Sequence, residues 1–95
     1  MRRVITAHFF DRPPLTITIQ GKRPNWLLDI LRTRGDTGTT SIEHPGVRVA
    51  DAVLKLRRAG LAIETITERH EGAFAGNHAR YVLRVERVDI EREAA

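Results

Sequence analysis

The chain has 95 residues, with 16 Lys or Arg against 12 Asp or Glu and a formal net charge of +4. A chain of this length forms one domain with a modest core, which excludes a deep substrate chamber. It has no cysteine, so disulfides and thiolate metal sites are excluded and a reducing compartment fits. No apolar run approaches the length of a membrane span and no signal peptide opens the chain, so the sequence predicts a cytoplasmic protein without a membrane partner.

The basic residues are almost all of one kind. Fourteen of the 16 are Arg, whose planar guanidinium group suits two-point contact with phosphate or guanine. The composition is therefore compatible with a polyanionic partner, although it does not identify one.

Two strands are predicted at the beginning of the chain. Residues 2–10 are rich in β-branched and aromatic types, and residues 15–20 alternate apolar and polar side chains after a Pro-Pro break. This predicts a β-hairpin within residues 1–23, with its apolar face formed by Leu15, Ile17 and Ile19. A lone hairpin is marginal in water. It must therefore pack through Phe9, Phe10 and Trp26 on its own chain, or pair with a second copy as a homodimer.

Two helices are predicted next. Pro24 and Asn25 are typical of a helix start, and the apolar stripe that follows predicts a helix over 25–34, ended by Gly35. Thr40 and Glu43 then have the spacing of a capping box. This predicts a short second helix that is stopped by Pro45 and Gly46.

The third predicted helix, residues 46–60, has two contrasting sides. Its apolar side consists of Val49, Ala52, Val53 and Leu56. Its charged side consists of Arg48, Asp51, Lys55 and Arg58. Gly60 suits the left-handed position at a helix end, and Leu61 can then fold back onto Leu56.

After Gly60 the periodicity becomes that of strands. Strands are predicted over 61–67 and 79–86, separated by a long polar loop, residues 68–78. Loops of this length are often functional, but a solvated hairpin tip is the equal alternative. The last segment, 87–95, alternates charge and is predicted to fray, although Val88 and Ile90 could prolong the strand.

This order of elements resembles the winged helix-turn-helix domains of bacteria and phages. The resemblance is carried by residues 27–31, 39–43, 53–65 and 79–83 and covers about 24–86. It implies an α+β fold of three helices and a C-terminal β-hairpin wing, here with an extra N-terminal hairpin and a charged tail. The very short second helix and the Pro45-Gly46 connection depart from the family pattern.

The resemblance also implies a function: sequence-dependent binding of double-stranded DNA by helix 46–60 and wing 68–80. A transcriptional regulator or a phage-type DNA-handling accessory, associated with the nucleoid, is the expected role. The candidate contact residues are Thr39, Thr40, Ser41, Arg48, Asp51, Lys55, Arg58, Arg69, His70, His78 and Arg80.

These residues would have different tasks. Residues 39–41 offer hydroxyls and helix-start amides to a phosphate, while simple capping is the alternative for Thr40. Asp51 can accept from a cytosine amino group, although phosphate would repel it unless it pairs with Arg48 or Lys55.

No enzyme, cofactor or small-molecule substrate is predicted, because no nucleophile–base set and no phosphate-binding glycine loop is visible. His70 and His78 could face each other across the loop, but no Cys or carboxylate cluster accompanies them, so no metal site is predicted. The alternative function is a winged helix that binds an acidic protein and no DNA.

Overall fold

The computed structural model describes residues 1–73 and 75–94, which form six strands and two α-helices. Position 74 of the predicted wing and position 95 of the predicted tail lie outside this range. In chain order the elements are β1 (Arg2–His8), β2 (Leu15–Gln20), α1 (Lys22–Arg34), the 3₁₀ turn η1 (Gly35–Thr37), β3 (Thr39–Thr40), the 3₁₀ turn η2 (Ser41–Glu43), α2 (Val49–Ala59), β4 (Ile63–His70), β5 (Gly76–Leu83) and β6 (Arg87–Ala94). The α+β class is thus as predicted, whereas the prediction of three helices is wrong.

The two ends of the chain meet in one antiparallel sheet of order β2-β1-β6. Ile5 in the central strand lies opposite Ile17 on one side and Ile90 on the other. The prediction that residues 87–95 fray is therefore wrong for 87–94. Val88 and Ile90 alternate with charged residues, so β6 can turn its apolar side chains toward the helices and its charged ones toward water.

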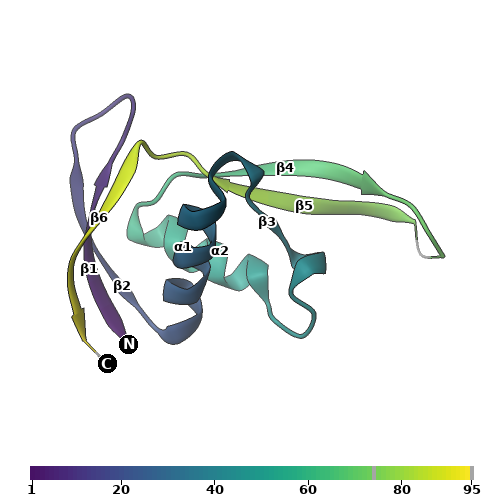
Figure 1. Cartoon of the computed structure of the whole chain (residues 1–95), viewed down its shortest axis with the longest axis horizontal. Coiled ribbons are helices and arrows are strands. Elements are labelled where there is room, and N and C mark those ends of the chain that lie inside the picture. Colours follow the sequence, from purple (N-terminus) through teal and green to yellow (C-terminus); the bar gives the residue numbers. More distant parts are fainter. Residues whose placement is uncertain (74, 95) are drawn as a thin grey trace.

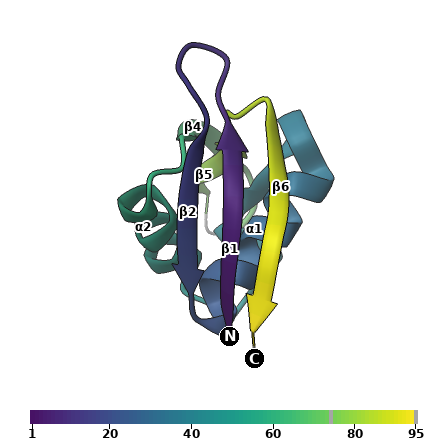
Figure 2. The same ribbon diagram turned by 90° about the vertical axis from the view of Figure 1, so that its left-hand side faces the viewer.

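Both helices pack on one face of this sheet, α2 beside β2 and α1 toward β6 (Figure 2). Strands and helices share a single apolar cluster, which includes Ile5, Ile17, Leu28, Leu56 and Val88. The N-terminal strands therefore pack on their own chain, and the alternative of packing within one chain is confirmed. Ile17 and Ile19 are buried as predicted, but Leu15 is 47% exposed at the sheet edge.

Arg3 connects this sheet to α1. Its guanidinium donates to both carboxylate oxygens of Asp29, over 2.6 and 2.9 Å, and its Nε lies 2.7 Å from a carboxylate oxygen of Glu93 on β6. The hydrogen bond to Asp29 raises the pKa of Arg3, so the cation is held firmly charged. One guanidinium group thus joins β1, β6 and α1.

We expect Arg3→Ala to lower the free energy of unfolding by about 1–2 kcal/mol, less than for a fully buried pair because water can reach Asp29. Urea denaturation measures this cost. Arg2→Ala is the matched control, because Arg2 is exposed and has no polar partner in the described part of the chain. Equal losses in the two variants would contradict the anchoring role.

α1 begins earlier than predicted, at Lys22, and ends at Gly35 as predicted. Pro24 is tolerated within the first turn because an amide there would have no helical acceptor. The buried side chain of Asn25 donates to the carbonyl oxygens of Ile19 and Gly21, over 3.1 and 2.8 Å. These bonds fix the turn between β2 and α1.

The predicted second helix is reduced to the single 3₁₀ turn η2. Thr40 is buried and its hydroxyl caps nothing, so the predicted capping box is wrong. Glu43 instead pairs with Arg34 at the end of α1. Pairing of β3 with β5, Thr39 opposite Tyr81, holds this segment extended and leaves only one turn before Pro45.

The third predicted helix is α2. It begins at Val49 rather than at 46, because Gly46 (φ 83°) and Arg48 (ψ 78°) are not helical. Its end is as predicted: Gly60 has φ 120°, and the Leu61 amide donates to the Leu56 carbonyl oxygen over 3.1 Å. β4 and β5 then form a long hairpin that extends away from both helices (Figure 1), with β3 paired at its base.

Candidate functional site

The outward side of α2 is the principal candidate surface. Val49, Ala52, Val53 and Leu56 are all buried, so the helix turns its remaining positions toward solvent. Arg48, Asp51, Lys55 and Arg58 are exposed, as the sequence predicted. Leu54, which the apolar and charged stripes of the sequence do not include, is 43% exposed on the same helix.

The cations of this surface remain available to a ligand. Within the described residues, the side chains of Arg48 and Arg58 make no hydrogen bond or ion pair. Lys55 contacts Asp51, with Nζ 3.3 Å from the carboxylate oxygen, at the spacing of one helical turn. This pair fulfils the condition under which Asp51 is tolerated on an anion-binding face, because its charge is offset locally.

Arg57 belongs to the architecture instead. It donates to the Ile63 carbonyl oxygen through Nε and a terminal nitrogen, over 3.2 and 2.7 Å, and to the Thr65 hydroxyl over 2.7 Å. Since Ile63 and Thr65 lie in β4, this side chain fixes the start of the hairpin against the end of α2.

The wing differs in charge from α2. Residues 63–83 carry three Glu and two Arg, whereas residues 48–59 carry four cations and one Asp.

The strands of the wing continue into the predicted loop. His70 lies opposite Gly76, so that only residues 71–75 connect the two strands. The long-loop prediction for 68–78 is wrong, since exposed residues on both faces conceal the alternation that marks a strand.

The predicted wing contacts are mostly paired with wing acids. Arg69 lies 3.2 Å from Glu71, and both side chains are 78% exposed. His78 lies 3.0 Å from Glu68, and its Nδ1 lies 3.0 Å from Nδ1 of His70. Arg69 is therefore the wing cation that an external partner can reach most easily.

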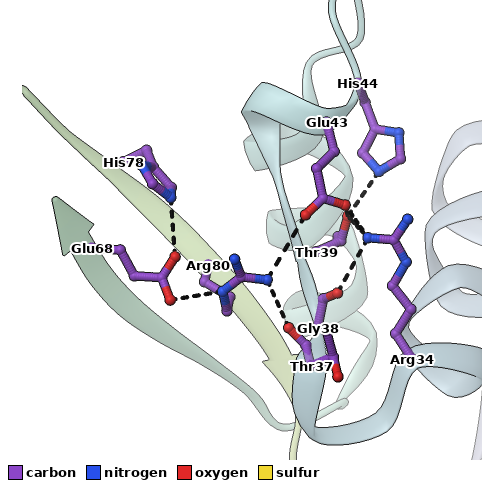
Figure 3. A network of polar contacts seen from close by, with 9 residues as sticks. All are labelled: Arg34, Thr37, Gly38, Thr39, Glu43, His44, Glu68, His78 and Arg80. Carbon is purple, nitrogen blue, oxygen red and sulfur yellow. Dashed lines mark hydrogen bonds and ion pairs between the residues drawn. The ribbon is translucent and has the colours of Figure 1, made fainter. Parts of the chain in front are cut away.

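Arg80 has an internal role at the base of the wing (Figure 3). It donates to Glu68 over 2.8 Å and to the Thr37 carbonyl oxygen over 2.8 Å, and it lies 3.8 Å from Glu43. Glu43 in turn pairs with Arg34. This chain of contacts joins the wing to η1, η2 and the end of α1, so it sets the direction of the hairpin relative to the helices.

The same network explains the positions of residues 39–41. Thr39 and Thr40 are buried. The Thr39 hydroxyl lies 2.7 Å from His44 Nε2 and 3.2 Å from Glu43. These two hydroxyls therefore do not face solvent, contrary to the phosphate-binding prediction. Ser41 alone of the three is exposed.

The network makes the stability of the fold depend on pH. Hydrogen bonds from Arg34 to Glu43, and from Arg80 to Glu68, lower the pKa of each carboxyl group below its usual 4.5. At falling pH the unfolded chain therefore takes up protons first. The stabilisation is complete above the usual carboxyl pKa and is lost as the pH falls through the lowered values.

We expect Glu68→Gln to reduce the acid sensitivity of folding, because it removes one of these carboxyl groups. Chemical denaturation between about pH 7 and about pH 2 measures the dependence. Glu86→Gln is the control, since its side chain has no partner among the described residues. An unchanged pH slope in Glu68→Gln would show that the ionised Glu68 carboxylate does not stabilise the fold.

Sequence reasoning missed the network because its members come from six elements: α1, η1, β3, η2, β4 and β5. One signal was available: Glu68 directly follows the predicted strand 61–67 and Arg80 lies in the predicted strand 79–86, and opposite charges on neighbouring strands stabilise sheets. The described residues contain no cluster of three metal-binding side chains, and none of their helices is long and apolar enough to cross a membrane.

A family model described as a winged helix domain matches residues 16–94 of the chain. The match begins in β2 and includes β6, so it extends beyond the region 24–86 that carried the sequence resemblance. Searches of curated proteins and of solved structures found no match.

Proposed function

The chain belongs to the winged-helix domain family, and from this premise we propose that it binds double-stranded DNA with the exposed side of α2. The observation that carries the proposal is the pair Arg48 and Arg58, two exposed guanidinium groups without a partner in the described part of the chain. They stand at the two ends of one helix, and an α-helix fits the DNA major groove.

The proposed contacts follow from the geometry of α2. Arg48 and Lys55 are the candidates for guanine edges, and Arg58 is the candidate for the phosphate backbone. Leu54 lies among these residues on the exposed surface and offers an apolar contact to a thymine methyl group. Base contacts of this kind would make the binding dependent on sequence.

The wing has a smaller proposed part. Since Arg80 and His78 are engaged with Glu68, we expect the wing to contribute mainly through Arg69, near its tip. The role proposed for the whole protein is a regulator of transcription or a DNA-handling accessory in the cytoplasm, of the bacterial or phage-associated type, with no catalytic step. The support for this finer role is the sequence resemblance.

A titration with labelled duplex of random sequence tests the proposal. We expect saturable binding that weakens steeply with salt, because each phosphate contact releases about one counterion. With two to four such contacts, affinity should fall by about tenfold to about 150-fold when salt rises fourfold. If circular dichroism shows that the chain is folded and no binding is seen at low salt, DNA is excluded as the partner.

A further inference from the structure

β2 is an edge strand without the usual protection. The sheet order β2-β1-β6 leaves one side of β2 without a neighbouring strand among the described residues. Its sequence, Leu-Thr-Ile-Thr-Ile-Gln, contains no charge, proline or glycine. Edge strands expose unpaired backbone amides and carbonyls, and proteins normally shield them with charges, prolines or bulges. β2 has the composition of a strand that accepts a partner.

The other edge strand shows the contrast. β6 has the sequence Arg-Val-Asp-Ile-Glu-Arg-Glu-Ala, with five charged residues in eight, and its pairing with β1 shifts register between Val4 and Ile5. Both features discourage the addition of a further strand. The same small sheet thus has one protected edge and one open edge.

A basic depression lies beside the open edge. It has a volume of about 360 Å³ and is lined by residues of β2, the first turn of α1 and the last turns of α2: Thr18, Ile19, Gln20, Pro24, Lys55, Arg58 and Ala59. Two cations, and no acidic residue, contribute to this lining. Figures 1 and 2 show that α2 runs across the direction of β2 with its C-terminal end beside that strand, so a strand added to β2 would cross the last turns of the helix.

We propose that this edge is the docking site of an extended acidic peptide from another protein, added to β2 as a fourth strand. Successive side chains of a strand point to opposite faces. Alternate residues of the peptide would therefore point toward the helices. Those beside residues 18–20 of β2 would meet Lys55 and Arg58, and carboxylates there would be neutralised. The residues between them would lie beside the exposed Thr16 and Thr18.

A second copy of this chain fits the edge less well. Pairing of β2 with its own copy would bring Lys55 and Arg58 of both molecules to one seam, and β2 has no acidic residue to offset them. DNA could neutralise the same cations, but it cannot pair with the backbone of β2. The inference is independent of the proposed DNA binding, and the two ligands would compete for Lys55 and Arg58.

The test uses the full chain and a labelled peptide of alternating Thr and Glu, about eight residues long, the length of an ordinary strand. We expect saturable binding and slowed amide hydrogen exchange in β2. A peptide with proline at its centre should fail to bind, because it interrupts the backbone ladder. A peptide with Lys in place of Glu should also fail.

Two variants place the site. Lys55→Gln combined with Arg58→Gln should weaken peptide binding about tenfold, as expected for the loss of two exposed ion pairs. Arg48→Gln is the matched control on the same helix and should leave peptide affinity unchanged, although it should weaken DNA binding.

Three results would overturn the proposal. The proline peptide could bind as tightly as the Thr-Glu peptide, or Arg48→Gln could lose as much peptide affinity as the double variant. Sedimentation could also show that the chain self-associates and that this association causes the amide protection of β2. Peptide binding without DNA binding would refute the proposed function alone. DNA binding without peptide binding would refute this inference alone.

Discussion

We expect Arg48→Ala and Arg58→Ala to weaken duplex binding, Arg48→Ala by about 1–3 kcal/mol if its side chain reads a base. Arg58→Ala should weaken binding to all sequences similarly. It should also reduce the slope of log affinity against log salt concentration by about one, as expected for the loss of one phosphate contact. The variants should fold normally, because neither side chain has a polar partner in the described part of the chain. Fluorescence anisotropy at two salt concentrations measures both effects.

Arg92→Ala is the control for charge alone. Arg92 is also exposed and has no polar partner among the described residues, but it lies on β6, in the sheet on the other side of the helices. It should reduce affinity only slightly, through the change in net charge. If Arg92→Ala weakens binding as much as Arg48→Ala and Arg58→Ala, the affinity comes from overall charge and α2 is not the reading element.

The local patterns in the sequence predicted the elements whose two faces differ in environment. β2 was predicted with its observed bounds because one side is buried and the other is exposed. The apolar face of α2 and its end at Gly60 were predicted for the same reason, since a helix side and a left-handed glycine each leave a local signal.

The predictions failed where the structure depends on residues distant in sequence. Nothing within residues 87–94 reveals that β1 has an open side, and pairing with β1 is what makes that segment a strand. Glu43 has the spacing of a capping box, but Arg34 and Arg80 bind it more strongly than an amide would. For the candidate site, the sequence correctly placed Arg48, Lys55 and Arg58 on the surface. It could not show that Arg80 and His78 are occupied by Glu68.

The last prediction concerns Gly38, which joins the 3₁₀ turn η1 to β3. Its φ is +61°, and a Cβ atom added there would lie 2.1 Å from the Tyr81 carbonyl oxygen and 2.8 Å from a Val82 methyl carbon. Because Tyr81 pairs with Thr39, no space can open unless β3 separates from β5. We therefore expect Gly38→Ala to cost about 2–5 kcal/mol, the sum of left-handed backbone strain and overpacking.

Gly35→Ala separates these two contributions. Gly35 also has a positive φ, +54°, but a Cβ atom there would meet no other atom within 4 Å. It should cost only the backbone strain, about 1–2 kcal/mol. Urea denaturation of both variants gives the difference, which is the cost of overpacking the contact between β3 and the base of the wing. Equal costs would mean that this contact yields easily, and then the polar network around Arg80 alone would have to hold the wing in its direction.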